Sequence, residues 1–397
     1  MDALATPSNW QKVRLGDIAE IKRGASPRPI ENPKWFCTNS NVGWVRISDI
    51  SKNSRFLYKT AQKLSKKGIE KSRFVKQNSL IMSMCATIGK PIITKIDTCI
   101  HDGFVVFENP KIDLNYLYYF LCYIEKEWLE SGQQGSQVNL NVDLIKNKEV
   151  FCPKDLNEQA AIANILSDVD RYLYSLRALI LKKESVKKAL SFELLSQRKR
   201  LKGFNQNWQR VRLGDICEFG NGEAYETLIV ENGNFKLISL NSIDIDGNLK
   251  NTMKRVNFYD NSLKQDDIVM VLSDVAHGDF LGLCAVIPNN DYVLNQRMGR
   301  LRKKNDCINI LFLRLYINAN QKYFKMQGQG SSQLNLSKKA IEDFEILLPP
   351  LNEQIAIANV LSDLDHEIIS LKNKKRQFEN IKKALNHDLM SAKIRVL

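Results

Sequence analysis

Two copies of one segment decide the architecture of this chain. Leu156-Asn-Glu-Gln-Ala-Ala-Ile-Ala-Asn-Ile-Leu-Ser-Asp-Val-Asp170 returns 195 residues later as Leu351-Asn-Glu-Gln-Ile-Ala-Ile-Ala-Asn-Val-Leu-Ser-Asp-Leu-Asp365, with changes at three of its fifteen positions. Trp10-Gln-Lys-Val-Arg-Leu-Gly-Asp-Ile-Ala-Glu20 likewise returns as Trp208-Gln-Arg-Val-Arg-Leu-Gly-Asp-Ile-Cys-Glu218, with changes at two of eleven. A repeat of this length is too long for a solenoid or propeller unit. The sequence therefore predicts a duplicated domain, which can present two similar surfaces to one extended target.

Apolar residues recur at alternating steps of four and three downstream of each Leu-Asn-Glu-Gln motif. They are Ile162, Leu166, Val169, Leu173, Leu176, Ile180, Leu190 and Leu194, and then Ile357, Leu361, Leu364, Ile368, Leu371, Phe378, Leu385 and Leu389. This heptad seam, which no Pro or Gly interrupts, predicts two helices of about 40 residues, each roughly 60 Å long. Because a small domain cannot bury so long a stripe, we expect the helices to pair antiparallel, as a coiled-coil spacer with pseudo-twofold symmetry. Lysines interrupt the seam, and such polar positions can set its register: Lys183, Lys187, Lys375 and Lys382.

The remaining parts of each half consist of short apolar runs separated by Gly, Asn, Asp and Ser, a pattern typical of strands. The runs are 44–48, 79–83, 92–94 and 103–107, and then 235–239, 267–272, 283–287 and 300–301. We expect each half to open with a short strand, around Val13, Leu15 and Ile18 and around Val211, Leu213 and Ile216, and to contain helical segments at 114–130 and 308–325. The predicted fold class is α/β (α+β) domains in tandem duplication, each with a mostly antiparallel sheet. The predicted boundaries are 1–153, 154–202 (helix), 203–349 and 350–397 (helix).

Composition restricts the class of protein. An apolar fraction of 44% without a long apolar run argues against a membrane span, and residues 1–9 lack the layout of a secretory signal. Eight scattered cysteines without a CxxC pair, and only four histidines, indicate reduced thiols in the cytoplasm rather than disulfides or a zinc site. The net charge is +14, and the stretches 182–202 and 372–395 contribute +6 each. Such concentrated positive charge favours a polyanion or an acidic protein as partner.

No catalytic motif is present. Walker, HExxH, GxSxG and amino-methyltransferase signatures are absent. The nearest candidate is an acid followed by E-x-K, formed by Asp17, Glu20 and Lys22, which would suit a metal-dependent nuclease. Its duplicate ends at Gly220 and lacks the lysine. We therefore predict no catalytic and no metal-binding residue, with a stand-alone nuclease as one alternative and a coiled-coil scaffold that binds no DNA as another.

Basic and amide side chains in the two predicted α/β domains suit contacts with nucleic acid. Lys22, Arg23 and Arg28 belong to a basic loop that could bind phosphates, whereas the counterpart at 220–225 is not basic. Gln137 and Gln333 lie in Gly-rich polar loops that could reach base edges; alternatively, these loops are turns in which Asn139 and Asn335 cap the next helix. Sequence-specific contacts are expected where the halves diverge, at Arg46, Ser83, His101, Asn241, His277, Gln296 and Arg297.

The paired W-x-x-V-x-L-G-D-I and L-N-E-Q-x-A-I-A-x-x-L-S-x-x-D motifs resemble those of the specificity subunit of a type I restriction–modification system, over essentially the whole chain. The resemblance implies two target-recognition domains that read the halves of a bipartite double-stranded DNA site. It implies helices that act as a spacer and dock methyltransferase subunits, typically two, through Asn157, Glu158, Gln159, Asn352, Glu353 and Gln354. The implied complex methylates adenine with S-adenosylmethionine and, with two endonuclease–translocase subunits, cleaves DNA with ATP and Mg²⁺. This chain itself is expected to hold no cofactor.

Overall fold

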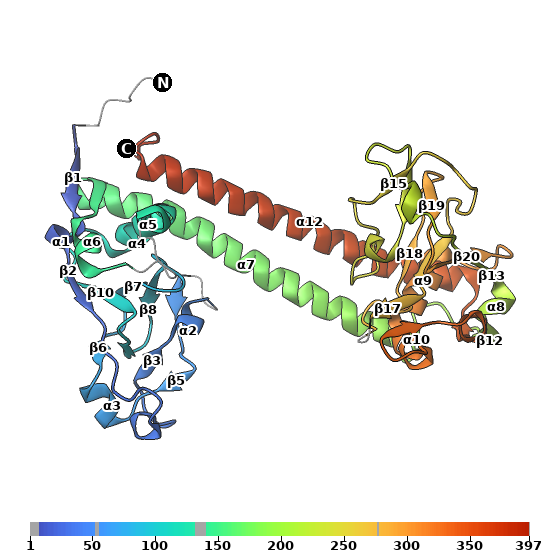
Figure 1. The fold of residues 1–397 in the computed structure, drawn as a ribbon, viewed down its shortest axis with the longest axis horizontal. Coiled ribbons are helices and arrows are strands. Elements are labelled where there is room, and N and C mark those ends of the chain that lie inside the picture. The colour runs from blue at the N-terminus through green and yellow to red at the C-terminus, as the bar shows by residue number, and fades with distance from the viewer. Residues whose placement is uncertain (1–7, 52–54, 132–139, 276–277, 397) are drawn as a thin grey trace. The chain divides into compact units, whose positions relative to one another are not determined.

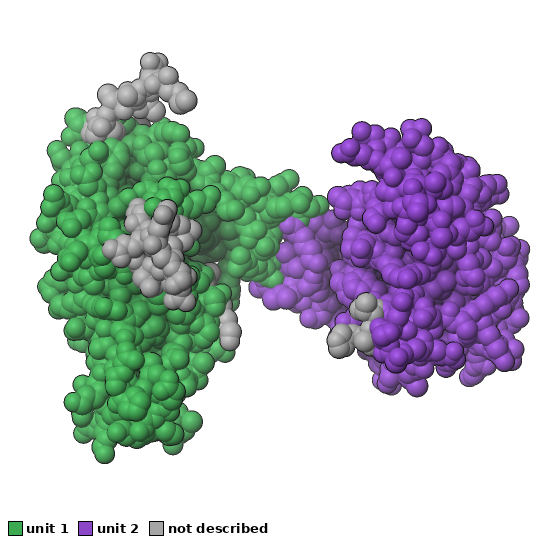
Figure 2. All heavy atoms as spheres, in the orientation of Figure 1, with its two compact units in different colours: residues 1–177, 373–397 green, residues 178–372 purple. Residues whose placement is uncertain are grey.

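The computed structural model describes residues 8–51, 55–131, 140–275 and 278–396. The chain forms two compact units (Figure 2), of which unit 1 comprises Met1–Arg177 and Asn373–Leu397, and unit 2 comprises Ala178–Lys372. The boundary between the units falls within each long helix, so each unit contains one head and a part of both helices. We call residues 8–153 the first head and residues 204–349 the second head. None of the described helices is long and apolar enough to span a membrane.

The two long helices have the predicted length. Helix α7 (Leu156–Leu195) and helix α12 (Leu351–Met390) each contain 40 residues and run without a break (Figure 1). Both end in the same way, because Gln197 and Ala392, two residues beyond the last helical residue, have φ angles of 60° and 58°. A residue in the left-handed region commonly terminates a helix. The duplication therefore extends to the signals that stop each helix.

Each unit contains an antiparallel helix pair with a buried apolar seam. Predicted heptad residues such as Ile162 and Leu166 in unit 1, and Ile357 and Leu361 in unit 2, are at most 1% exposed. Three of the four interrupting lysines form ion pairs with the other helix: Lys382 with Asp170 in unit 1, and Lys187 with Asp365 and Lys183 with Glu367 in unit 2. The fourth, Lys375, pairs with Glu379 of its own helix. The polar interruptions of the seam are thus matched by carboxylates.

The first head is built from several small sheets. Strand β1 (Trp10–Arg14) pairs antiparallel with β11 (Glu149–Pro153). The five-stranded sheet has the order β2 (Glu20–Arg23), β10 (Phe104–Glu108), β7 (Leu80–Ser83), β8 (Pro91–Thr94) and β4 (Phe56–Leu57). The four-stranded sheet has the order β5 (Gln62–Lys63), β3 (Gly43–Val45), β9 (Thr98–Ile100) and β6 (Arg73–Val75). The helices are α1 (Leu15–Ile18), α2 (Ile47–Ser51), α3 (Lys66–Glu70), α4 (Leu114–Tyr123), α5 (Glu125–Ser131) and α6 (Val142–Asn147).

The second head repeats this plan with variations. Strand β12 (Gln209–Arg212) pairs with β22 (Glu345–Leu348). A four-stranded sheet has the order β13 (Cys217–Asn221), β20 (Met298–Lys303), β16 (Ile268–Val271) and β18 (Cys284–Val286), and a three-stranded sheet has the order β15 (Arg255–Val256), β14 (Phe235–Ile238) and β19 (Tyr292–Leu294). Strand β17 (Ser273–Val275) pairs with β21 (Gln333–Asn335). The helices are α8 (Leu213–Ile216), α9 (Ile310–Ala319), α10 (Gln321–Gln327) and α11 (Lys338–Glu342).

The main core of each unit joins the head to the ends of both long helices. In unit 1, helix α4 packs with Ile162 at the start of α7 and with Leu389 near the end of α12. In unit 2, helix α9 packs with Ile357 at the start of α12 and with Leu194 at the end of α7. The apolar stripe of each helix thus serves both as the seam and as part of the core of a head.

The helical segments expected at 114–130 and 308–325 are present, and each is divided into two helices. Two other local expectations from the sequence were wrong. The opening strands end at Arg14 and Arg212, and the next four residues form α1 and α8, because Leu15 and Ile18, spaced as on one helical turn, are both buried. Asn335 caps no helix, because it lies in β21 and Ser337 caps α11 instead. Asn139 lies outside the described residues, and Asn141 caps α6.

Candidate nucleic-acid interface

Both heads have the same structural feature, a pair of adjacent parallel strands. Strand β3 runs parallel to β9, with Val45 opposite Ile100, and β14 runs parallel to β19, with Ile238 opposite Leu294. The segments that follow these four strands carry Arg46 and His101 in the first head, and Asn241, Gln296 and Arg297 in the second. Because parallel strands end at the same edge of a sheet, five predicted DNA-binding residues lie at equivalent edges of the two heads.

A glycine brings a third segment to each edge. A Cβ atom on Gly24 would lie 2.0 Å from the carbonyl oxygen of His101, and one on Gly222 would lie 2.1 Å from that of Asn295. The backbone amide of Gly24 donates a hydrogen bond to the carbonyl oxygen of Phe104 in β10, and the amide of Gly222 donates one to the carbonyl oxygen of Met298 in β20. Only glycine permits so close an approach of two backbones. The loops after β2 and β13 are therefore fixed against the ends of β9 and β19.

In the first head the basic loop is organised around one carboxylate. The side chain of Asp102 accepts hydrogen bonds from Arg28 Nη2 at 2.7 Å and Ser26 Oγ at 2.9 Å, and its carbonyl oxygen accepts one from Arg23 Nε at 2.8 Å. Burial raises the pKa of Asp102, but the Ser26 hydrogen bond and the Arg28 charge outweigh it, so the pKa lies below its ordinary value. The ionised carboxylate fixes the loop, and Arg28 remains 70% exposed.

His101 is held in a mostly buried position beside this loop. Its Nδ1 accepts a hydrogen bond from the Gly103 amide at 2.9 Å, and its ring lies 4.7 Å from that of Phe104. Burial lowers the pKa of His101, and the neighbouring Asp102 opposes this effect only in part. The imidazole is therefore neutral at neutral pH. It can take part in a hydrogen bond or a packing contact, but it adds no positive charge to the surface.

Arg46 and Arg297 differ from the arginines around them. Within the described residues, neither guanidinium forms a hydrogen bond or an ion pair, although the Arg46 amide donates to Asp49. The other arginines near these edges are engaged: Arg23, Arg28, Arg55, Arg73, Arg255, Arg300 and Arg302. Arg297 is exposed and has a φ angle of 66°, which is uncommon for a residue other than glycine. Strained backbone of this kind concentrates at functional sites.

A cavity of about 150 Å³ brings together three of the predicted residues of the second head. Asn241 follows β14, while Gln296 and Arg297 follow β19, and all three line this cavity together with Lys254 and Glu226. A hydrogen bond from Gln296 is the main cause of the lowered pKa of Glu226, which also accepts from Asn295 Nδ2 at 3.0 Å. The cavity thus presents amides, two cations and one ionised carboxylate. Sequence reasoning missed Lys254 and Glu226, because nothing near them in the chain points to this edge.

The remaining predicted residues lie elsewhere. Lys22, on β2, forms ion pairs with Glu20 at 3.0 Å and Glu108 at 2.6 Å. Its hydrogen bond to Glu108, and to a smaller extent that to Glu20, raises the pKa of Lys22. Ser83 is fully buried and donates its hydroxyl to the carbonyl of Thr87, so its side chain is not on the surface of the head. Gln333, on β21, donates to Ser273. Gln137 and His277 fall outside the described residues.

The glutamines of the two Leu-Asn-Glu-Gln motifs are internal. Gln159 Oε1 accepts from the Asp113 amide and its Nε2 donates to the Pro153 carbonyl, both at 2.8 Å. Gln354 repeats these bonds at the same distances with the Asn309 amide and the Pro349 carbonyl. The two glutamines are 1% and 0% exposed. They attach the first turn of each long helix to the last strand of the head and to the start of α4 or α9.

The glutamates of the motifs also have internal partners. Glu158 accepts from Trp10 Nε1 at 3.1 Å, and Glu353 accepts from Trp208 Nε1 at the same distance. Glu353 is 0% exposed and also binds Arg200. Asn157 and Asn352 are the two members of the predicted docking set that the structure leaves exposed. Direct contact of Gln159, Gln354 or Glu353 with a partner would require local unfolding.

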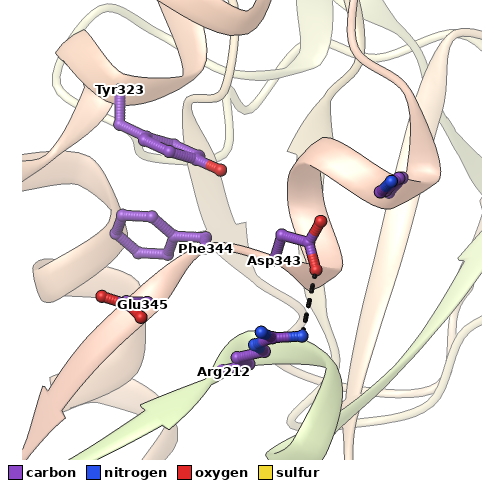
Figure 3. Close-up of a pocket in the computed structure, with 6 residues that line it drawn as sticks. Arg212, Tyr323, Asp343, Phe344 and Glu345 are labelled. Carbon is purple, nitrogen blue, oxygen red and sulfur yellow. Dashed lines mark ion pairs between the residues drawn. The ribbon is translucent and has the colours of Figure 1, made fainter.

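A larger cavity, of about 660 Å³, lies in another part of the second head. Figure 3 shows the rings of Tyr323 and Phe344 beside the ion pair of Arg212 with Asp343, whose atoms are 3.6 Å apart. The cavity belongs to β12, β22 and the helices α10 and α11, which carry none of the predicted DNA-binding residues. It is therefore separate from the edge that gathers Asn241, Gln296 and Arg297.

The nuclease-like triad has no support in the structure. Hydrogen bonds from Asn109 and then Lys22 lower the pKa of Glu20, so this carboxylate already has protein partners. In the part of the chain that the structure describes, no three His, Cys, Asp or Glu side chains are grouped so that they could hold a metal ion.

Comparison with known proteins identifies the family. The profile of the type I restriction modification DNA specificity domain matches residues 7–184 and again residues 205–380. The chain therefore belongs to the family of type I restriction–modification DNA specificity subunits, the DNA-recognition subunits of these complexes. This assignment does not favour the nuclease or scaffold alternatives, and it agrees with the tandem recognition domains and paired helices predicted from the sequence.

Relatives match the chain over its full length. It is 26% identical to the type I restriction enzyme MjaVIII specificity subunit of Methanocaldococcus jannaschii, over 100% of this chain and 95% of that protein. It is 24% identical to the putative MjaX specificity subunit of the same organism, over 98% and 95%. The crystal structure of the type I S subunit from M. genitalium has a TM-score of 0.64 at 17% identity, with 98% of both chains covered. That last similarity shows the shared fold.

Proposed function

We propose that this chain directs a type I restriction–modification complex to a bipartite, asymmetric DNA site, in which each head reads one half. The observation that carries the proposal is the pair of equivalent sheet edges with different side chains. The first edge offers Arg46 and His101, whereas the second offers Asn241, Gln296 and Arg297. Equivalent positions with different donors and acceptors suit two different base sequences.

Arg46 and Arg297 are the leading candidates for base contacts. Each guanidinium lacks a hydrogen-bonding partner among the described residues and lies at the end of a parallel strand pair. Arginine most commonly reads guanine through its O6 and N7 atoms, with two hydrogen bonds. Arg23, Arg28 and Lys254 are assigned to phosphates, which position the protein without selecting a sequence. Lys22, Gln137, His277 and Gln333 remain predicted DNA contacts of lower rank.

The long helices are assigned two roles, a spacer between the half-sites and a docking surface for methyltransferase subunits. Exposed apolar side chains occur at equivalent positions of the two helices, Tyr174 with Ile369 and Val186 with Ile381, and these are between 44% and 75% exposed. Unit 1 contains Tyr174 and Ile381, and unit 2 contains Val186 and Ile369. One such set in each unit supports the binding of two methyltransferase subunits, and we assign Asn157 and Asn352 as additional polar contacts, separate from these sets.

The complete assembly would contain two methyltransferase and two endonuclease–translocase subunits in the cytoplasm, and those subunits would bind S-adenosylmethionine, ATP and Mg²⁺. The test is reconstitution with purified subunits. Methyl transfer to DNA that contains the site should require both this chain and the methyltransferase, and neither alone should suffice. Site-specific methylation by the methyltransferase without this chain would refute the proposal, and so would methylation by this chain alone.

A further inference from the structure

The contacts between α7 and α12 repeat from one unit to the other. Asp170 with Lys382 in unit 1 corresponds, at the offset of 195 residues, to Asp365 with Lys187 in unit 2. We call such a pair of facing residues, together with its equivalent in the other unit, a level of the seam. A second level repeats in the same way, with Arg177 and Glu379 in unit 1 at 3.2 Å and their equivalents in unit 2, Lys372 and Glu184, at 2.7 Å. Two levels of the seam thus have the same charges in both units.

A third level breaks this repetition. In unit 1 the rings of Tyr172 and Phe378 lie against each other, with centroids 4.6 Å apart and an interplanar angle of 53°. The equivalent residues in unit 2 are Glu367 and Lys183, whose Oε2 and Nζ atoms form an ion pair at 2.8 Å. None of these four side chains is buried. The same pair of equivalent positions therefore forms an aromatic contact in unit 1 and an ion pair in unit 2.

The difference matters because the two halves of the chain are duplicates. Helix α7 of one copy could pair antiparallel with α7 of a second copy in the same register. The repeated levels would not prevent this, since Asp170 would meet Lys187 and Arg177 would meet Glu184. A pair of α12 helices would likewise place Asp365 opposite Lys382. The ion pairs of these two levels can form in like pairs (α7 with α7, or α12 with α12) as well as in unlike pairs (α7 with α12). They therefore do not discriminate between the two kinds of pair.

The third level does discriminate. A pair of α7 helices would place Tyr172 opposite Lys183, and a pair of α12 helices would place Glu367 opposite Phe378. Exchange into like pairs loses both the aromatic contact and the ion pair, and the pair of α12 helices sets the Glu367 carboxylate against the electron-rich face or the apolar body of the Phe378 ring. The observed pairing of α7 with α12 keeps both favourable contacts.

We propose that the level formed by Tyr172, Phe378, Lys183 and Glu367 selects the partner of each helix, so that the first half of the chain pairs with the second half and not with its own equivalent in another copy. The selection ensures that one head of each kind is attached to every helix pair. This inference rests on the helix contacts and does not depend on whether the heads read DNA.

The experiment uses the folded full-length chain, opened at one point after folding. A site for a specific protease is inserted at Gly203, in the loop between α7 and β12. This glycine is exposed, and a Cβ atom added to it would have no neighbour within 4 Å. After cleavage, two preparations with first halves of different mass are mixed and warmed until the halves exchange. Native mass spectrometry then gives the ratio of unlike to like pairs.

Two variants remove the difference between the units. Lys183→Phe with Glu367→Tyr makes both units aromatic, and Tyr172→Glu with Phe378→Lys makes both ionic, so either variant serves if the other fails to fold. All four substitutions together transpose the two levels and form the matched control. We expect like pairs to increase about tenfold relative to unlike pairs in each two-residue variant, and to return to the wild-type level in the control. An unchanged ratio in the two-residue variants would overturn the proposal.

Discussion

Gln354 gives the sharpest test of how the Leu-Asn-Glu-Gln motif works. Its side chain is 0% exposed and forms three hydrogen bonds, with the Asn309 amide and the Pro349 carbonyl at 2.8 Å and with the Cys307 carbonyl at 3.0 Å. In Gln354→Ala the Pro349 carbonyl loses its bond in a buried setting, and the Asn309 amide in a partly buried one. An unsatisfied buried group costs about 1–3 kcal/mol, and the lost Cγ methylene adds about 1 kcal/mol. We expect a total loss of about 3 kcal/mol.

The measurement is thermal and urea unfolding of the full-length chain, with hydrogen exchange to localise the change. Unit 2 contains residues 178–372, a size for which about 3 kcal/mol lowers Tm by roughly 6–12 °C. Gln159→Ala should have a similar effect on unit 1, while Asn352→Ala, at an exposed position, should change stability by less than about 0.5 kcal/mol. Instead, Asn352→Ala should weaken binding of the methyltransferase subunit. If Gln354→Ala lowered the free energy of unfolding no more than Asn352→Ala does, the internal role of the glutamine would be refuted.

Three further predictions concern recognition, spacing and pH. Arg297→Ala should relax one base position in one half-site, with about 1–3 kcal/mol of discrimination lost, and Arg46→Ala should do the same in the other half-site. Arg210→Ala on β12 is the control and should leave the motif unchanged. Methylome sequencing of the three variants measures these outcomes. Four residues inserted into α7 should shift a head by roughly 6 Å, close to two base pairs, and change the gap between unchanged half-sites; altered half-sites with a constant gap would refute the spacer role. Because the pKa of His101 lies below 6.5 in the folded protein, stability should fall as the pH drops through 6.5, where the unfolded chain takes up the proton first. His101→Asn should lessen that fall in urea titrations between about pH 7.5 and 5.5, and an unaltered pH profile would contradict the burial argument.

The long helices and the duplicated plan could be predicted from the sequence because their signals are local and repeated. A stripe at steps of three and four without Gly or Pro is sufficient for a helix of 40 residues. The one-turn helix at Leu15–Ile18 could not be recognised in the same way, because four residues fit a strand or a helix equally well. Asn335 was misassigned for a related reason, since its strand partner β17 lies some sixty residues earlier in the chain.

The candidate site could be predicted only in part. Divergence between the halves pointed to Arg46, Asn241, Gln296 and Arg297, which the structure places at equivalent sheet edges. Divergence cannot show which cations are already engaged, because that depends on carboxylates distant in sequence. Arg302, for example, is bound to Asp267 at 2.6 Å, whereas Arg297, five residues earlier, forms no ion pair with any residue that the structure describes. Nor can a sequence show that the side chain of Ser83 is fully buried in the first head.

The central claim is that two different heads read two different half-sites across a fixed gap. The most direct test is methylome sequencing of a host that has no adenine methylation of its own and that carries this chain with its methyltransferase. The account predicts a single bipartite motif with unlike half-sites and an unspecified stretch of constant length between them. A continuous motif, or two identical half-sites, would contradict it.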